Sequence, residues 1–302
     1  MLIFSTSTTY GGISPKKRIN VAIILQNWDI LDNSDTTKLS VYLHKRCLRQ
    51  YENKYNAKFR VYEFWDSFDG GDVQKGLLKK FNIDVVIGPG GFGCLYTPEK
   101  YRKEIKDFVR SGGGFYGICG DSTFGSLGIT HKSRKLLRIV NRIFEIDTIT
   151  PMLKLANVYS DASVFEPIID ESTIFTRINL IRSLIRLPIS RAALFIKKTY
   201  PPVQEPYFRS TVRTMMGNAP LTDGPMLYHI FMPRVFTIAV YLGCDSPYDK
   251  TIRGEKAIVG TTYGRGRVIL SSPHPEFTVG NWKAHEIYVR NILWLADLLP
   301  DT

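Results

Sequence analysis

The chain of 302 residues is 44% hydrophobic and 23% charged, a composition that supports a buried core and excludes a disordered polymer. Its formal net charge of +12 means that its surface can attract nucleic acid, an anionic membrane or an acidic partner, although a solvated basic face is the simpler interpretation. The apolar runs are shorter than the roughly 18 residues of a membrane-spanning helix. The apolar stretch at the N-terminus, Leu2 to Phe4, is too short for the apolar region of a signal peptide, so we expect a cytoplasmic protein.

The first 130 residues alternate between short apolar runs and stretches with helical spacing. We expect strands at 19–25, 58–65, 83–87 and 115–118, and helices at 37–55, 72–81 and 98–109. Asp72 is expected to cap the second helix, and Pro98 to stand in the first turn of the third. Because parallel strands must be joined by crossover segments, this alternation predicts an α/β fold with a mostly parallel sheet and helices on both faces.

The pattern is weaker over residues 131–233, which we interpret as an insertion or cap region. Helical spacing returns at 132–144 and at 174–187, where isoleucines gather on one face and arginines lie elsewhere. Packing of the second helix on the main domain, or on another copy of the chain, is the simplest interpretation. A lid over a ligand site and contact with an anionic membrane are the alternatives.

Strand patterns return in the last part of the chain. We expect strands at 235–242, 257–263 and 267–272, a glycine-rich hairpin turn between the last two, and a closing amphipathic helix over 281–299. His285 lies on this helix, where a surface or capping position is expected. Residues 1–130 and 234–302 would therefore form one α/β domain that the insertion interrupts.

Residues 117–122 read Gly-Ile-Cys-Gly-Asp-Ser and place Cys119 between a strand and the first turn of a helix. This order predicts a nucleophile elbow, in which a sharp turn lifts the side chain above the sheet and small neighbours permit the turn. The N-terminus of the helix would favour the thiolate. The alternative is a cysteine buried at a strand end as a small apolar side chain.

A glycine-rich turn, Gly88-Pro89-Gly90-Gly91, follows the preceding strand. Ligands of such sheets bind at the carboxyl ends of the strands, where backbone N–H groups can face a carbonyl oxygen. An oxyanion hole is therefore expected from the amides of Gly90, Gly91 and Gly120. An ordinary strand-to-helix turn is the alternative.

The third motif, Ser272-Pro273-His274-Pro275-Glu276, follows another apolar strand. A thiol nucleophile needs a base, and a histidine base needs an acceptor that orients it. His274 can supply the first and Glu276 the second. A lone histidine is more often a polar loop residue, but its combination with an elbow cysteine and a nearby glutamate predicts a triad of Cys119, His274 and Glu276.

These motifs together resemble the class I glutamine amidotransferase-like superfamily, which has a flavodoxin-like fold. Cys119, His274 and Glu276 match its Cys-His-Glu triad, and the Pro89-Gly90-Gly91 turn matches its oxyanion loop. The resemblance implies a cysteine-dependent hydrolase or amidotransferase-like enzyme that acts on an amide or related C–N bond, with no cofactor and no metal.

The resemblance covers about residues 19–130 and 235–298. Residues 111–119 and 263–276 look most similar to one subgroup, which contains the amidotransferase-like domain called the biotin–protein ligase N-terminal domain. A ligase catalytic domain is not evident in the sequence, so this similarity implies little about biotin.

The sequence departs from the pattern of glutamine-hydrolysing members at Asp121, where they have glycine, and at Thr123, where they have glutamine. Glutamine is therefore not implied as the substrate. Asp121 is a candidate for binding a substrate amine, although capping of the helix is the favoured role, and its charge would oppose a thiolate. Cys94 and Tyr96, which follow the glycine turn, are candidates for substrate contact, with packing favoured for Cys94.

Three functions thus remain open: the thiol enzyme, a non-catalytic binding or assembly module that keeps the same fold and pocket, and, less favoured, a basic protein that binds nucleic acid or a membrane surface. The expected partner is a small-molecule or peptide amide substrate, and residues 131–233 are candidates for a homo-oligomer contact. Cys47 and Cys244 are expected to be structural. The cysteines lack Cys-x-x-Cys spacing, so we expect free thiols without a disulfide framework or structural zinc.

Overall fold

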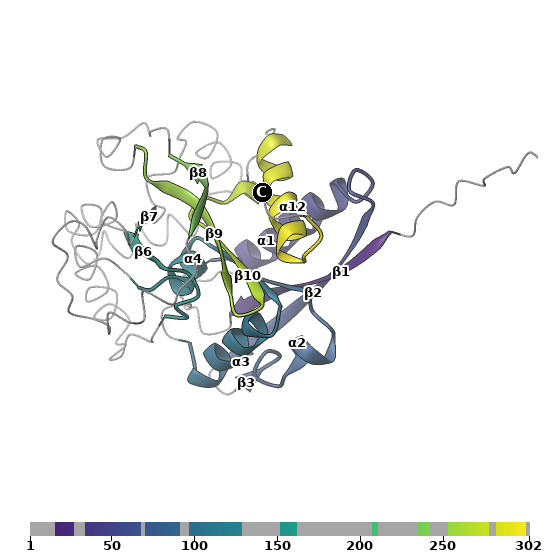
Figure 1. Cartoon of the computed structure of the whole chain (residues 1–302). Helices are drawn as coiled ribbons and strands as arrows, with labels where there is room; N and C mark the ends of the chain where they lie inside the picture. The colour runs from purple at the N-terminus through teal and green to yellow at the C-terminus, as the bar shows by residue number, and fades with distance from the viewer. Residues whose placement is uncertain are drawn as a thin grey trace, which may run out of the picture.

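The computed structural model describes residues 16–26, 34–67, 70–90, 97–128, 152–161, 207–210, 235–241, 253–277 and 282–299. Within them, one sheet runs through the molecule and helices lie on both of its sides (Figure 1). The helices expected at 132–144 and 174–187 lie outside the described residues, as do Gly91, Cys94, Tyr96 and Cys244.

Parallel strands form the centre of this sheet. They are β1 (Lys17–Gln26), β2 (Ala57–Ser67), β4 (Val85–Gly88), β5 (Gly114–Ile118) and β10 (Gly266–Ser271). They lie in the order β2–β1–β4–β5–β10, and every neighbouring pair in that series is parallel. Counted along the chain, this is the 2-1-3-4-5 order of flavodoxin-like sheets. The predicted α/β fold is confirmed.

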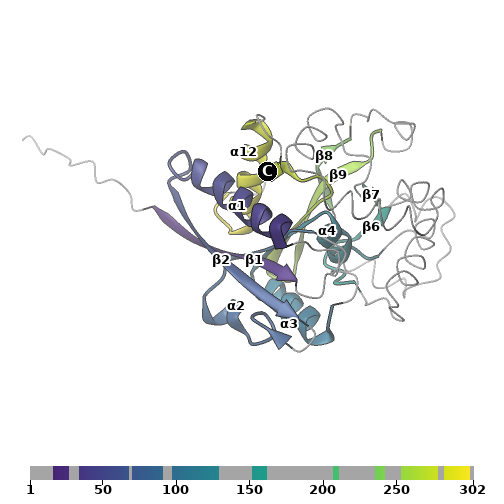
Figure 2. The ribbon, with the colours of Figure 1, turned by 180° about the vertical axis from the view of Figure 1, so that it is seen from behind.

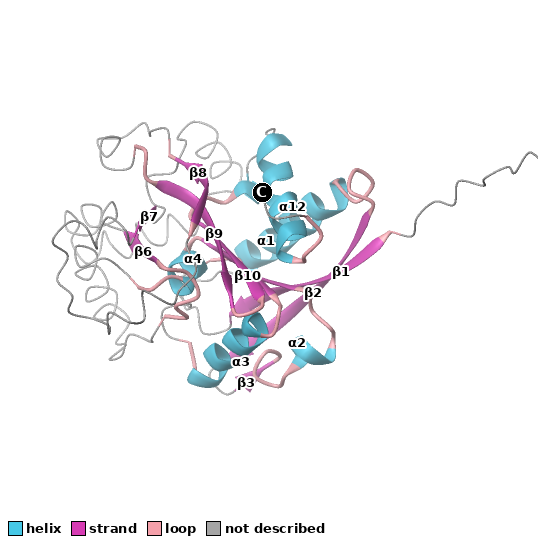
Figure 3. Cartoon of the chain, in the orientation of Figure 1, coloured by secondary structure: helices cyan, strands magenta, loops and turns pink. Residues whose placement is uncertain are grey.

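Antiparallel strands extend the sheet at both edges (Figure 3). β3 (Gly70–Gly71) pairs with β2, and β9 (Lys256–Tyr263) forms the predicted hairpin with β10. Beyond the hairpin, β8 (Phe236–Val240) and β7 (Tyr207–Ser210) both pair with β9, and β6 (Val158–Asp161) pairs with β7. The described sheet is therefore parallel at its centre and antiparallel beyond β10.

Alternate residues of the central strands bury opposite faces of the sheet. Val21 and Ile23 belong to the core that includes residues of α1 (Ser34–Gln50) and α12 (Trp282–Leu295). Ala22 and Ile24 belong to the core of α2 (Leu77–Lys80), α3 (Glu99–Arg110) and α4 (Gly120–Gly125). Seen from behind, α1 and α12 again lie together and apart from α2 and α3 (Figure 2). Burial on both faces explains the continuous apolar runs of these strands.

The helix predicted for 72–81 is wrong in its first half, because α2 spans only Leu77–Lys80. The preceding Gly76 has a left-handed backbone with φ of 76°, which does not continue a helix. Asp72 does not cap α2. Its carboxylate instead accepts a hydrogen bond from the Trp65 amide at 2.7 Å, and such side-chain-to-backbone bonds compete with a helix.

Two further expectations for helices need correction. The first helix ends at Gln50, and not near residue 55, because residues 51–56 form turns that lead to Asn56 with φ of 46°. His285 is buried on α12, with 8% of its surface exposed, so the expected surface position is wrong. None of the described helices has the length and apolar character that crossing a membrane requires.

Parts of residues 131–233 belong to the main sheet. Residues 158–161 and 207–210 supply β6 and β7, and the side chains of Leu153 and Leu155 are fully buried in the core beneath α3 and α4. The α/β domain therefore includes segments that the predicted division assigns to the insertion. Residues 153–158 pack here because the buried side chains of Leu153, Leu155 and Val158 belong to the core on the side of α4.

Candidate active site

Three loops meet at the carboxyl ends of β4, β5 and β10. The β-carbon that an alanine would have at Gly90 would lie 2.9 Å from Cys119 Cβ and 3.6 Å from His274 Cε1. In addition, the Cys119 amide donates a hydrogen bond to the Ser271 carbonyl at 2.9 Å, which ties the cysteine turn to the strand that leads to His274. The structure thus brings together Gly90, Cys119 and His274 from the three predicted motifs.

Cys119 occupies a sharp turn between β5 and α4. Its φ of 52° and ψ of −117° are unusual for a residue with a side chain, and such conformations cluster at functional sites. Gly117 permits the turn, because a β-carbon there would lie 2.5 Å from the Asp121 carbonyl oxygen. This is the backbone geometry that the elbow motif predicts, and it leaves the cysteine only partly buried.

His274 and Glu276 form a close pair at the end of β10. His274 Nδ1 lies 2.7 Å from Glu276 Oε1, and a short 3-10 helix at Pro275–Phe277 turns the glutamate inward. The side chain of Glu276 is completely buried, whereas 17% of the His274 side chain is exposed. A ligand can therefore reach the histidine from solvent, while the carboxylate behind it is shielded.

The charges of this pair support each other. Burial disfavours a protonated His274, but the Glu276 carboxylate and hydrogen bonds with Cys119 and Glu276 outweigh burial and raise the pKa of His274 well above its ordinary value. Burial likewise opposes an ionised Glu276, but the charge of His274, the electrostatic influence of His44 and the hydrogen bond with His274 lower the pKa of the carboxyl group. The arrangement therefore favours the imidazolium form of His274, which is the form that the ring has after it accepts a proton.

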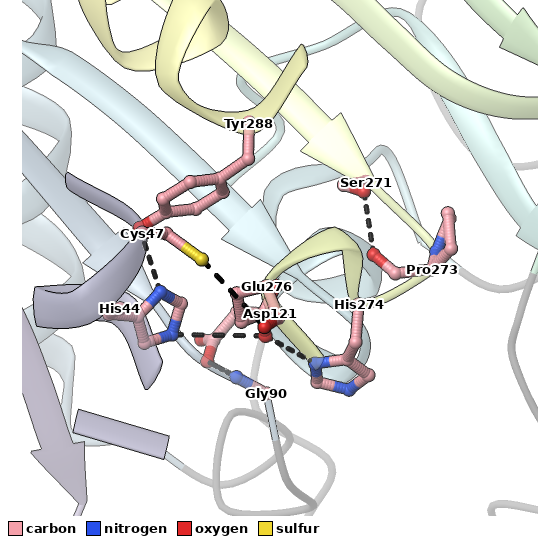
Figure 4. A network of polar contacts seen from close by, with 9 residues as sticks. All are labelled: His44, Cys47, Gly90, Asp121, Ser271, Pro273, His274, Glu276 and Tyr288. Carbon is pink, nitrogen blue, oxygen red and sulfur yellow. Dashed lines mark hydrogen bonds and ion pairs between the residues drawn. The ribbon is translucent and has the colours of Figure 1, made fainter. Parts of the chain in front are cut away.

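A second histidine, His44 of α1, lies on the other side of Glu276 (Figure 4). Its Nε2 is 3.9 Å from Glu276 Oε1, and its Nδ1 is 2.7 Å from the hydroxyl of Tyr288 on α12. Neither His44 nor Tyr288 was among the predicted site residues. A signal was present, because His44 has helical spacing to the buried Val41 and Leu48, and a polar residue on a buried face needs a partner.

Cys47 also faces this cluster, one turn after His44 on α1. Its thiol donates to the Glu276 carbonyl oxygen at a sulfur–oxygen distance of 3.8 Å. Burial is the largest influence on this thiol and raises its pKa to about 12. Cys47 is therefore an unreactive packing residue, in agreement with the structural role predicted for it.

The predicted oxyanion amides differ in their surroundings. The Gly90 N–H donates a hydrogen bond to Asp121 Oδ2 at 2.9 Å, so in this conformation it is engaged by a carboxylate. Gly120 is the first residue of α4, and amides in the first turn of a helix have no acceptor within the helix. Gly91 lies outside the described residues. The oxyanion role of these amides stays a prediction.

Asp121 does not cap α4 as predicted. Cys119 is the N-cap residue and makes no side-chain cap hydrogen bond, while the buried Asp121 reaches across to the Gly90 amide. Gly88 makes this reach feasible, because a β-carbon there would lie 2.6 Å from Asp121 Cγ. Asp121 thus connects the cysteine turn to the neighbouring glycine loop.

Thr123 makes its side-chain hydrogen bond with β6. Its hydroxyl lies 2.7 Å from that of Ser160 on β6, and both side chains are buried. The residue that replaces the glutamine of the amidotransferase pattern therefore joins α4 to the antiparallel part of the sheet. Within the described part of the chain, no group of three or more His, Cys, Asp and Glu side chains has the arrangement of a metal site.

Comparisons with known proteins leave the family open. No family model and no curated protein matches the chain. A solved ThuA-like protein from Parabacteroides merdae is similar at a TM-score of 0.40 and 12% identity, over 93% of this chain and 90% of that one. A GH42 β-galactosidase structure is similar at a TM-score of 0.36 and 11% identity, over 93% of this chain and 30% of that one. Such values carry no argument about function, which must come from the site.

Proposed function

We propose that this protein is a cysteine-dependent, amidotransferase-like hydrolase that cleaves an amide or related C–N bond with Cys119, His274 and Glu276. The observation that carries the proposal is the contact of one histidine with both partners. Cys119 Cβ and His274 Cε1 both lie within 4 Å of the position of a β-carbon at Gly90, and the Cys119 side chain raises the pKa of His274. His274 Nδ1 lies 2.7 Å from the buried Glu276 carboxylate. The resemblance of the three sequence motifs to class I glutamine amidotransferases supports the same assignment.

The chemistry follows from these contacts. His274 takes the thiol proton, and the Cys119 sulfur attacks the substrate carbonyl carbon to form a tetrahedral oxyanion. His274 then gives its proton to the leaving nitrogen as the C–N bond breaks, which leaves an acyl-thioester on Cys119. Water, deprotonated by His274, attacks the thioester, releases a carboxylic acid and restores the thiol. Glu276 keeps Nδ1 facing inward and stabilises the imidazolium.

The oxyanion requires N–H donors at the same strand ends. The Gly120 amide follows the nucleophile directly and is the first candidate. The Gly90 amide becomes a donor to substrate only when it exchanges its hydrogen bond with Asp121 for one with the oxyanion. Asp121 would thus regulate the second donor, and a substrate amine could draw its carboxylate away.

A labelling experiment tests the proposal without knowledge of the substrate. The protein is treated with iodoacetamide at neutral pH, and alkylation of Cys119 and Cys47 is followed by peptide mass spectrometry. Cys47 serves as the internal control, because burial raises its pKa to about 12. We expect rapid alkylation of Cys119, a strong reduction in His274→Ala, and little reaction at Cys47.

Acyl transfer is then tested with p-nitrophenyl acetate as a simple acyl donor and with glutamine as an amide. Intact mass spectrometry should detect an acyl group on the wild-type protein and none on the Cys119→Ala variant. An equal acylation of both proteins would contradict the proposal.

The second candidate is a non-catalytic binding or assembly module. The hydrogen bond between Gly90 and Asp121 favours it, because this bond occupies a predicted oxyanion donor with a buried carboxylate. A Cys119 that reacts no faster than an ordinary thiol, with no effect of His274→Ala, would support this function. A cytoplasmic location, a small-molecule or peptide amide substrate and a homo-oligomer contact through residues 131–233 belong to the leading proposal.

A further inference from the structure

The carboxylate of Glu276 lies between two imidazole rings (Figure 4). His274 Nδ1 approaches its Oε1 to 2.7 Å, and His44 Nε2 lies 3.9 Å from the same oxygen. The side chains of His44 and Glu276 are both fully buried. On its other side, His44 Nδ1 is 2.7 Å from the Tyr288 hydroxyl. A chain of polar contacts therefore runs from α12 through α1 to the proposed triad.

Electrostatics assigns the proton on His44. Burial raises the pKa of Tyr288 well above its ordinary value, so its hydroxyl keeps a proton, and burial lowers the pKa of His44, so its ring is neutral. A neutral ring has one N–H and one lone pair. A lone pair on Nε2 would be repelled by the carboxylate. The favourable arrangement has Tyr288 donating to Nδ1 and the Nε2–H facing Glu276.

We propose that His44 is a positioning residue for Glu276: Tyr288 fixes its tautomer, and its Nε2–H supports the negative charge of the carboxylate that orients His274. This inference rests on the proposed function, since it gives a task to residues behind the proposed triad. The contact of 3.9 Å is longer than a hydrogen bond, so His44 acts as an oriented dipole. In buried surroundings such dipoles act more strongly than in water.

Other titratable groups also face the pair of Glu276 and His274. They are Cys47 from α1, Tyr116 from β5, Cys119 from the elbow and Tyr288 from α12. Burial raises the pKa of Cys47 to about 12, and it raises the pKa of Tyr116 and Tyr288 above the ordinary tyrosine value. These three groups therefore remain neutral near pH 7 and do not account for a change of charge there.

The effect of His44 has a definite sign. While His274 is protonated, the pair carries no net charge, and when His274 loses its proton, Glu276 is left as an uncompensated anion. The Nε2–H dipole stabilises this second state more than the first. It therefore moderates the high pKa that Glu276 confers on His274, and leaves the histidine able to release its proton, as a general acid must.

The test compares two reagents for Cys119 across the pH range. An imidazolium beside the thiolate attracts anionic iodoacetate but not neutral iodoacetamide. The ratio of the two alkylation rates, measured by mass spectrometry of the Cys119 peptide, therefore falls at the pH where His274 loses its proton. We expect His44→Leu to move this fall to higher pH by about one unit. Tyr288→Phe should produce a smaller upward shift, and His44→Gln, which retains a side-chain N–H, should restore the wild-type profile.

Glu276→Gln is the matched control and should shift the profile in the opposite direction. Without the negative charge of Glu276, His274 loses its proton at lower pH, so the ratio of the two alkylation rates falls at lower pH. A downward shift in His44→Leu would mean that His44 merely holds Glu276 in place, and would overturn the proposal. The absence of a shift in folded His44→Leu would do the same. Thermal unfolding verifies folding of each variant. If His44→Leu does not fold, Tyr288→Phe, which removes a single oxygen atom, decides: an upward shift supports the proposal, and no shift overturns it.

Failure of the proposed function gives a different result. In that case the ratio of the iodoacetate rate to the iodoacetamide rate would not fall with rising pH in the wild-type protein, or it would fall equally in His274→Ala. If only the present inference fails, the ratio still falls with rising pH and Glu276→Gln still shifts that fall. The His44 and Tyr288 variants would then leave the pH of the fall unchanged.

Discussion

Replacing Gly90 with alanine would place a methyl group where the three loops meet. The φ of Gly90 is 106°, and a side chain in such a conformation costs about 1–3 kcal/mol. The new Cβ would also lie 2.9 Å from Cys119 Cβ and 3.2 Å from the Ile118 carbonyl oxygen. Because carbon atoms prefer a separation of about 3.5–4.0 Å, the contact with Cys119 requires a displacement of roughly 0.6–1 Å.

This displacement falls between the proposed nucleophile and its base, because the same Cβ would lie 3.6 Å from His274 Cε1. A misplacement of about 1 Å between reacting groups can reduce a rate by about a hundredfold. We therefore expect Gly90→Ala to slow alkylation of Cys119 by iodoacetamide at neutral pH by about ten- to a hundredfold. The measured quantity is the second-order rate constant, followed by peptide mass spectrometry.

Gly112→Ala provides the matched control. Gly112 has a similar φ of 120°, but a β-carbon there would meet no atom within 4 Å. Both variants should lose unfolding free energy through backbone strain, and Gly90→Ala should lose more because its methyl group also meets Cys119 and Ile118. Only Gly90→Ala should lose reactivity at Cys119. An equal loss of reactivity in the two variants, or a wild-type rate in Gly90→Ala, would refute the assignment of Gly90 to the contact between Cys119 and His274.

Three further perturbations have expected outcomes. The raised pKa of His274 contributes stability that is fully present below pH 6.5, the ordinary pKa of histidine, and that is lost as pH rises through the raised pKa. The lowered pKa of Glu276 contributes stability that is present above pH 4.5, the ordinary pKa of glutamate, and that is lost as pH falls through the lowered pKa. The difference in thermal unfolding between wild type and Glu276→Gln should thus be largest between pH 4.5 and 6.5, and a difference that keeps growing toward alkaline pH would contradict the pairing. Asp121→Asn keeps an acceptor for the Gly90 amide and removes a negative charge near the thiol, so alkylation of Cys119 should become several times faster; a slower rate would mean that the carboxylate supports the reactive state. Gly264→Ala, with φ of 61° and a new Cβ 2.8 Å from Arg110 Cα, should lower the unfolding free energy in urea by about 1–3 kcal/mol and leave the alkylation rate unchanged.

The parallel centre of the sheet could be predicted because its strands are buried on both faces. The run at 19–25 lies within β1, and the run at 83–87 overlaps β4. In contrast, β6 and β7 are four-residue strands whose pairing joins residues 158–161 to 207–210. Short runs such as these carry too few alternating residues to predict a strand, and their partners are set by the rest of the fold.

The site could be predicted where its residue types are distinctive and stand at strand ends, as with Cys119, His274 and Glu276. His44 shows the limit. Helical spacing indicates that His44 faces inward, but the sequence does not show which residue lies opposite. The hydrogen bond from the Gly90 amide to Asp121 is a long-range contact of the same kind, and local preference alone favoured a cap.

The pairing of β6 with β7 has a consequence for how the sequence of this protein can vary in evolution. Asp161 lies opposite Tyr207, so the end of β6 and the start of β7 stand at adjacent positions. The entropy cost of closing a loop rises only slowly with its length. Sequence of very different length can therefore be exchanged between these two positions, so that new binding preferences can arise there while the strand ends that carry Cys119 and His274 keep their geometry.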